Sequence, residues 1–232
     1  MMLDHWGTDE ALYDIGPRPL GDGIVDVQDL IVLAEHLFTY PGAVAYWKLD
    51  ETEGEIAYDS VGVNDGVLNG VPTWQPTSGM IDGALGLDGI GDYVSTEFVL
   101  NPADGPFSVF AWIKDGAPGQ AVLSQMGGVN WLCADTLEGN LMTELKGTGR
   151  GAAALLSQTI ITDGDWHRIG LVWDGSYRTL YVDDIAVAED TQDNSEGSEN
   201  GLYIGAGKAK EPGTLWSGLI DDVRIYNRAV SP

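Results

Sequence analysis

The chain is short of cysteine and of cations. Cys133 is the single cysteine among 232 residues, and one thiol cannot close an intrachain disulfide, so it gives no information about the redox compartment. Lys and Arg number 11 against 36 Asp and Glu, a formal net charge of -25. A field of that sign repels nucleic acid and anionic membrane surfaces, which excludes both as partners.

The sequence also lacks a long apolar run. No stretch approaches the roughly 20 apolar residues that a membrane-spanning helix needs, so we expect no membrane span. The first residues have neither the basic start nor the apolar core of a signal peptide.

Glycine and aromatic residues are abundant instead. The 32 Gly and 8 Trp residues argue against a disordered acidic chain. Asp-Gly and Asn-Gly pairs recur after residue 42, and these dipeptides supply the positive φ angles that tight hairpins need. The pattern predicts an all-β fold, an antiparallel sandwich of two sheets.

Apolar and alternating runs between these turns predict the strands. In the last run, Val223 and Ile225 face one way while Arg224 and Tyr226 face the other, which indicates a sheet with one buried face. The predicted strands are Ala43–Leu49, Ala84–Leu87, Tyr93–Thr96, Phe107–Lys114, Ala121–Met126, Trp131–Ala134, Asn140–Leu145, Arg168–Trp173, Thr179–Val182, Leu202–Ile204 and Leu219–Tyr226.

Residues 1–40 have a helical pattern and an internal repeat. Met2–Trp6 resembles Leu33–Leu37 in its order of apolar, acidic and His residues. Apolar residues from Val27 to Phe38 fall on one helical stripe, with Asp26 placed to cap the helix. We expect two parts, a short α-helical segment at 1–40 and a sandwich at 41–232.

The second copy of this repeat, Gly21–Phe38, resembles the loop and helix of a dockerin-type, EF-hand-like calcium repeat. Arg18 and Leu20 stand where that pattern has Asp or Asn, and a cation at the first position opposes calcium. We therefore expect a degenerate helical remnant that packs without metal. A chain that begins inside a repeat is expected to be an excerpt of a longer secreted protein. The ligands that the resemblance implies are Asp22, Asp26 and Asp29.

Six stretches after the linker resemble, in order, the laminin-G-like (concanavalin A-like) jelly rolls of secreted bacterial proteins. The resemblance implies a non-catalytic module at the cell surface or outside the cell, which binds carbohydrate and is stabilised by calcium. Its partner would be a polysaccharide, a cell-surface glycan or another extracellular protein. The stretches are Val44–Glu51, Tyr58–Gly66, Gly83–Val94, Phe107–Lys114, Asp165–Asp183 and Trp216–Ser231.

Calcium prefers hard oxygen ligands, and acidic residues follow the first strand and lie in the last. The first and last strands of such jelly rolls commonly neighbour each other, so the resemblance implies one ion shared by Asp59, Asn64 and Asp222. Asp88 and Asp92 form a second cluster around a glycine turn. The alternative is that all these acids are solvated turn caps.

The tryptophans divide between core and possible ligand platform. Trp47, Trp112 and Trp173 lie within strands, where we expect burial. Another three tryptophans lie near Pro, Gly or Asn, which are typical of the loops around the mouth of a sandwich. An exposed indole there can stack on a sugar ring. The alternative is ordinary packing. These ligand-binding candidates are Trp74, Trp131 and Trp216.

Catalysis is not expected. Glu51, Glu53 and Glu55 alternate as on a glycosidase strand, but Gly54 interrupts them and no apolar neighbour would raise the pKa of an acid. The three histidines form no metal triad and no Ser-His-Asp set. Two rival functions stay open, an adhesive protein-interaction domain without a sugar site and a glycosidase or polysaccharide lyase on the same fold.

Overall fold

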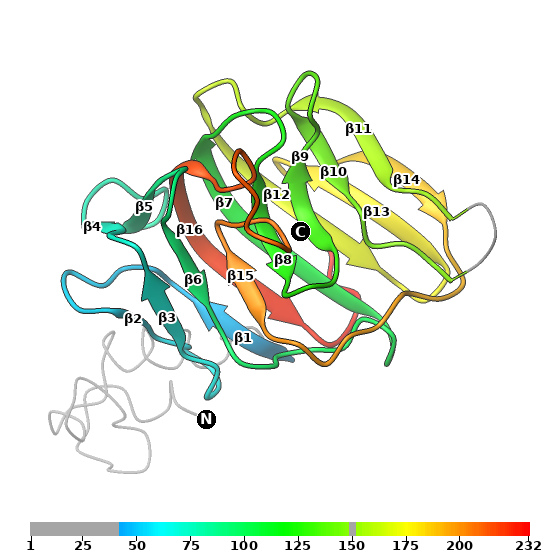
Figure 1. The fold of residues 1–232 in the computed structure, drawn as a ribbon. Helices are drawn as coiled ribbons and strands as arrows, with labels where there is room; N and C mark the ends of the chain where they lie inside the picture. The colour runs from blue at the N-terminus through cyan, green and yellow to red at the C-terminus, as the bar shows by residue number, and fades with distance from the viewer. Residues whose placement is uncertain (1–41, 149–151) are drawn as a thin grey trace, which may run out of the picture. The chain divides into compact units, whose positions relative to one another are not determined.

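A computed structural model describes residues 42–148 and 152–232 (Figure 1). The expected helical segment at 1–40, with Asp22, Asp26 and Asp29, lies outside the described residues, so the dockerin-like repeat stays a prediction. The strands of the described part form two antiparallel sheets stacked into a sandwich, which confirms the predicted fold class.

The first sheet, called the β16 sheet here, is built around the last strand of the chain. Seven of its strands follow one another across the sheet, and an eighth, β1, also pairs with β16. In that order the strands are β14 (Ile185–Thr191), β13 (Tyr177–Val182), β12 (Trp166–Trp173), β7 (Phe107–Asp115), β16 (Ser217–Tyr226), β5 (Ala84–Asp88) and β4 (Thr73–Gln75), with β1 (Ala43–Trp47) beside β16.

The second sheet, the β8 sheet, faces the viewer in Figure 1. Its strands also pair antiparallel throughout. In order they are β11 (Leu155–Ile160), β10 (Asn140–Thr143), β9 (Asn130–Ala134), β8 (Ala121–Gln125), β15 (Leu202–Ile204), β6 (Tyr93–Ser95), β3 (Gly66–Asn69) and β2 (Ile56–Ala57).

Each predicted strand overlaps an observed one, and the sequence missed β2, β3, β4, β11 and β14. Three of these, β2, β3 and β4, are only two to four residues long. β14 is an edge strand with no fully buried residue. Neither length nor alternation marks such strands in the sequence.

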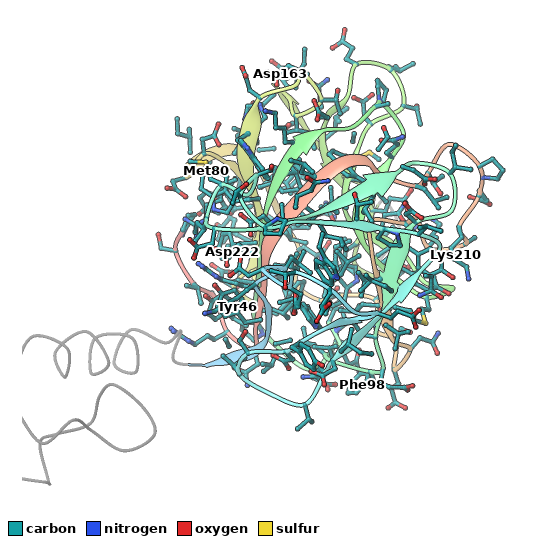
Figure 2. The ribbon with its side chains drawn as sticks, turned by 90° about the vertical axis from the view of Figure 1, so that its left-hand side faces the viewer. Tyr46, Met80, Phe98, Asp163, Lys210 and Asp222 are labelled. Atoms are coloured by element: carbon teal, nitrogen blue, oxygen red, sulfur yellow. The ribbon has the colours of Figure 1, made fainter. Side chains whose placement is uncertain are left out.

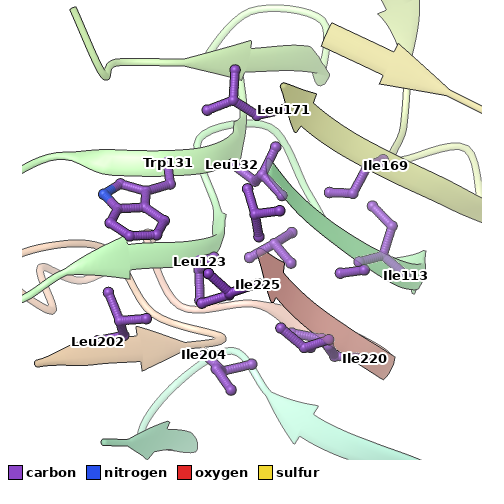
Figure 3. Packing of buried hydrophobic residues seen from close by; sticks show 14 of the residues in the cluster. Ile113, Leu123, Trp131, Leu132, Ile169, Leu171, Leu202, Ile204, Ile220 and Ile225 are labelled. Carbon is purple, nitrogen blue, oxygen red and sulfur yellow. The ribbon is translucent and has the colours of Figure 1, made fainter. Parts of the chain in front are cut away.

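The core fills the space between the sheets with the inward side chains of both. In β7 the inward residues Phe107, Val109, Ala111 and Ile113 are buried, as the alternation requires. Burying one large aliphatic side chain stabilises the fold by about 1.5–3 kcal/mol. Figure 3 shows Ile113, Ile169, Leu171, Ile220 and Ile225 of the β16 sheet with Leu123, Trp131, Leu132, Leu202 and Ile204 of the β8 sheet.

Trp131 and Trp216 belong to this core, so the prediction that they stack on sugar is wrong. Both are 0% exposed. The Trp131 ring lies 5.7 Å from the ring of Phe107, and Trp216 fills the space beside Gly116, where an added Cβ would come within 2.4 Å of the indole. Nearby glycines gave these residues a loop-like sequence context, but both side chains point inward.

Strand β16 contains a β-bulge that shifts its alternation. Its register with β7 breaks between Asp221 and Arg224, and Asp222 adopts a φ of 58°. Ile220 and Val223, three positions apart, therefore both reach the core. Beyond the bulge β16 pairs with β1, which confirms that the first and last strands are neighbours.

Arg178 joins the two sheets at one end of the sandwich. Its side chain, on β13, is almost fully buried and forms an ion pair with Asp190 of β14 at 2.5 Å. The same guanidinium donates to the carbonyl oxygens of Leu145 and Ala153, which flank the loop between β10 and β11. One side chain therefore satisfies three acceptors across both sheets.

We predict that Arg178→Ala destabilises the fold strongly. Removing the buried guanidinium leaves the Leu145 carbonyl without its donor and breaks the pair with Asp190, whose side chain is 39% exposed, which together costs about 2–3 kcal/mol. Urea unfolding of the purified chain measures the loss. Lys208→Ala is the control, because Lys208 forms a more exposed pair with Glu144 and should cost about 1 kcal/mol or less. Equal effects of the two substitutions would contradict the role given to Arg178.

His167, at the start of β12, lies between two carboxylates. Its Nδ1 is 2.9 Å from Asp183 Oδ2 and its Nε2 is 3.1 Å from Asp163 Oδ1. Burial opposes the charged ring, but the hydrogen bonds that the ring donates to Asp183 and Asp163 outweigh it and raise the pKa of His167 above 6.5. The folded state therefore binds the proton more tightly than the unfolded chain does.

We predict that His167 stabilises the fold only toward acid pH. Its contribution is fully present below the unfolded pKa, near 6.5, and is lost as the pH rises through the higher folded pKa. Urea unfolding at a series of pH values should show the wild type losing its advantage over His167→Gln across that interval. A constant difference between the two proteins from pH 5 to 9 would show that the proton does not matter.

Candidate functional site

A cavity of about 410 Å³ lies on the outer face of the β16 sheet. Its floor is formed by strands β12 to β14, and residues 229–231 of the C-terminal segment form a wall. The side chains that give it chemical character are Asp174, Tyr177, Thr179, Tyr181 and Glu189.

The alternation of β13 places the cavity's central row. Arg178, Leu180 and Val182 of this strand are buried, so Tyr177, Thr179 and Tyr181 project from the opposite face. Tyr177 is 48% exposed and Tyr181 is partly exposed. The two tyrosines lie about 13 Å apart along the strand, longer than one sugar ring.

The Asp-Gly turn between β12 and β13 fixes a carboxylate at one end of this row. Asp174 Oδ1 accepts the backbone N–H groups of Tyr177 at 2.7 Å and Ser176 at 2.8 Å, while Gly175 takes a φ of 99°. The hydrogen bond from Tyr177, followed by that from Ser176, lowers the pKa of Asp174. This carboxylate is therefore ionised at neutral pH.

Two further contacts complete the walls of the cavity. Glu189 of β14 accepts a hydrogen bond from the Thr179 hydroxyl at 3.2 Å. Ser108 of β7 holds the C-terminal wall, because its Oγ donates to the Arg228 carbonyl at 2.9 Å and accepts the Val230 N–H at 2.8 Å. The site combines aromatic surface with carboxylate and hydroxyl groups, the composition that small polar ligands require.

A second aromatic pair is already covered. Tyr93 and Tyr203 of the β8 sheet meet edge to face at 5.2 Å, and Lys210 Nζ lies 5.0 Å from the centroid of each ring. Figure 2 shows Lys210 on the side of the sandwich away from Met80 and Asp222. The lysine occupies the ring faces that a ligand would need, so this pair is the weaker candidate.

Trp74 is the one predicted tryptophan platform that keeps an exposed part. Its ring packs partly against the core, and its Nε1 donates to the Gly54 carbonyl at 3.0 Å. Trp47 and Trp173 are buried as expected, whereas Trp112 lies on the outer face of β7 and is partly exposed.

The structure does not bring the predicted calcium ligands Asp59, Asn64 and Asp222 to one shared point. Asp59 accepts the N–H of Tyr46 at 2.9 Å and both the backbone and side-chain amides of Asn64. Asp222 instead pairs with Arg224 at 2.5 Å and lies near the hydroxyl of Tyr46. The two carboxylates contact opposite ends of one tyrosine, and each is taken by protein donors.

The second predicted cluster is engaged in the same way. Asp88 Oδ1 accepts the N–H groups of Ile90 and Gly91, and Asp92 Oδ1 accepts that of Val71 at 2.7 Å. Asp88 is an exposed turn cap, as the alternative expects, whereas Asp92 is buried and ties the turn to Val71. Calcium binding at either predicted set of residues stays a prediction. Binding would require these hydrogen bonds to rearrange.

The acids considered for catalysis do not form a cleft site. Glu53 and Glu55 are exposed in the loop before β2, and Glu51 accepts the N–H of Tyr58 at 2.8 Å. Among residues 42–148 and 152–232, no group of three or more His, Cys, Asp or Glu side chains is placed to hold a metal ion. The same residues include no helix long and apolar enough to cross a membrane.

Solved structures share this fold at low sequence identity. Domain 4 of AbnA, a GH43 extracellular arabinanase from Geobacillus stearothermophilus in complex with arabinotriose, is 18% identical, with a TM-score of 0.65 over 82% of this chain and 94% of that domain. The binding domain of Paraclostridial Mosquitocidal Protein 1 is 12% identical, with a TM-score of 0.66 over 82% of this chain and 50% of the other.

A third similar structure is the ligand binding domain of botulinum neurotoxin serotype D in complex with N-acetylneuraminic acid. It is 15% identical, with a TM-score of 0.60 over 82% of this chain and 48% of the other. No curated protein sequence matches this chain. The family model of the concanavalin A-like lectin/glucanases superfamily matches residues 88–232, more than half of the sequence, and the chain therefore belongs to that superfamily.

Proposed function

We propose that this chain is a non-catalytic carbohydrate-binding module whose ligand lies in the cavity over β12 to β14. The observation that carries the proposal is the row of Tyr177, Thr179 and Tyr181, with the carboxylate of Asp174 at one end and that of Glu189 beside its middle. Aromatic faces stack on the apolar faces of sugar rings, and carboxylates accept sugar hydroxyl groups.

The charge of the cavity favours a neutral glycan over an acidic one. Asp174 and Glu189 line it, and the whole chain carries a formal charge of -25. An anionic sugar would meet like charges both in the cavity and at long range. The related domains were solved with arabinotriose, a neutral sugar, and with N-acetylneuraminic acid, an acidic one; the electrostatics of this chain support the first class.

Catalysis is the less favoured function for this cavity. A glycosidase needs a carboxylic acid that keeps its proton until it reaches the leaving group. Asp174 cannot supply one, because backbone hydrogen bonds lower its pKa. We place the module on a secreted or surface-attached protein, where it would hold that protein on a polysaccharide or cell-surface glycan.

Substituting the tyrosines tests the site. We predict that Tyr177→Ala and Tyr181→Ala each weaken binding to a neutral polysaccharide by about tenfold or more, because each removes stacking surface. Affinity electrophoresis, followed by titration calorimetry with the best ligand, measures the loss. Melting temperatures should change little, since both side chains lie on the outer face.

The matched control is Tyr58→Ala, which removes a 59% exposed tyrosine outside the cavity and should leave binding unchanged. Full binding by both cavity variants would show that the ligand lies elsewhere. A wild-type chain that binds no glycan across an array would favour the adhesive rival, and steady release of reducing ends would favour a glycosidase.

A further inference from the structure

A second cavity of about 410 Å³ lies at the end of the sandwich where the chain crosses from the β8 sheet to the β16 sheet. Residues 96–106 make this crossing between β6 and β7. Val99 and Leu100 line the cavity and pack partly against the core, which fixes its inner wall. The lining also includes Val44, near the start of β1, and Asn227, just after β16.

Phe98 is the aromatic residue of this cavity, which is called the Phe98 cavity here. Phe98 is 44% exposed, whereas Phe107 and Phe110, the other phenylalanines of the described residues, are buried. It lies beside apolar Val99 and Leu100 and so belongs to a concave apolar surface. Single exposed apolar residues are common on any protein, but a concave apolar surface with polar groups at its rim is typical of a ligand site.

The polar rim of the Phe98 cavity is held in place by its own hydrogen bonds. Asn101 Oδ1 accepts the N–H groups of Ala103 and Ser198, both at 3.1 Å. Asn101 Nδ2 donates to Asp104 Oδ1 at 2.9 Å. Gly197 packs tightly against this turn, because an added Cβ would come within 2.4 Å of Asn101 Oδ1. The turn therefore presents the exposed Asp104 at the rim without any rearrangement.

The Phe98 cavity adjoins the cavity of Tyr177 and Tyr181, called the tyrosine cavity from here on. The C-terminal segment contributes Asn227 to the first and residues 229–231 to the second. Pro106 lines the Phe98 cavity and lies beside the Asp-Gly turn of the tyrosine cavity, because a Cβ added at Gly175 would lie 3.6 Å from Pro106 Cγ. Pro106 is exposed, so it offers apolar surface between the two cavities.

The strand register gives the distance between the two cavities. It aligns the ends of β12, β7, β16 and β1 in one row, and β13 follows β12. Neighbouring strands lie about 4.8 Å apart, so the row from β13 to β1 spans about 19 Å. Figure 2 shows Phe98 at the end of the sandwich away from Asp163, which lies shortly before the start of β12. A ligand that fills both cavities is therefore an oligosaccharide of several sugars.

We propose that the Phe98 cavity is a second subsite, which holds the continuation of the glycan chain bound in the tyrosine cavity. This inference rests on the proposed function and adds a ligand class to it, an extended stretch of a neutral polysaccharide in place of a single terminal sugar. Phe98 supplies a face for stacking, and Asn227 and Asp104 supply hydrogen-bonding groups. Asp104 repeats the negative charge of Asp174, so both cavities favour the same neutral ligand.

The size and the place of the Phe98 cavity favour a continuing glycan over a protein partner. The two cavities have the same volume, about 410 Å³ each, and they lie beside one another. A stable protein interface needs a far larger surface, about 800 Å² on each partner. Two subsites on one glycan also act together, because binding at the first raises the effective concentration of the chain at the second.

Titration calorimetry of the full chain with cello-, xylo- and manno-oligosaccharides tests the second subsite, with each series supplied as a trisaccharide and a hexasaccharide. In the series that binds best, we expect the hexasaccharide to bind about tenfold or more tightly than the trisaccharide. Phe98→Ala should remove most of that gain and leave trisaccharide binding unchanged. Asn227→Ala should reduce the gain in the same way, whereas Tyr181→Ala should weaken binding at both lengths.

Leu137→Ala is the matched control, because Leu137 is apolar, 85% exposed and outside both cavities. It should keep the full gain with length. Equal affinity for the two lengths overturns the second subsite and leaves the tyrosine cavity as the binding site. A gain that both Phe98→Ala and Asn227→Ala retain does the same. Failure of the proposed function is distinct, because the wild type would then bind no series at either length, and that result overturns both.

Discussion

Strand β16 hydrogen-bonds to β1, β5 and β7, so the last strand of the chain holds together three strands from its first half. The pairing of Ala43 with Tyr226 brings together two residues that are separated by nearly the whole sequence of the sandwich. Long-range pairings of this kind bring their stabilisation only after the loop between them has closed. The part of the core beneath β1, β5 and β7 is therefore completed only when β16 joins these strands.

The same arrangement creates the weak point of the sheet. Two partners share one edge of β16, so they cannot both continue past the bulge, and the break collects turns with positive φ and buried carboxylates. In a chain with a formal charge of -25, unbalanced acid in the interior adds to a general self-repulsion. The break is thus where the alternation of the strand is least informative.

The sequence predicted the sandwich because its turns and core strands have strong local signals. Asp-Gly turns and inward alternation mark strands such as β7, whereas β4 and β14 form only because a neighbouring strand offers them an edge. The bulge did leave a signal, since Ile220 and Val223 are three apart and cannot share a face of a regular strand. Trp131 and Trp216 show the opposite failure, because proximity to glycine says nothing about where a side chain points. The alternation of β13 is enough to place the cavity tyrosines on the outer face. Only the fold shows that the C-terminal segment lies beside them and forms a wall of the cavity.

The tyrosine cavity and the break beside the bulge of β16 have different structural origins. Tyr177 and Tyr181 occupy outward positions that the core does not need, so their identity can follow a ligand without a cost in packing. Asp50 and Asp221 lie where three strands meet, and they accept the N–H groups of Gly83 and Ile81. Strands β12 and β7 separate β13 from β16 in the sheet, so the tyrosine cavity does not adjoin the bulge of β16. The tyrosines can therefore differ in identity while the bulge and its turns stay as they are.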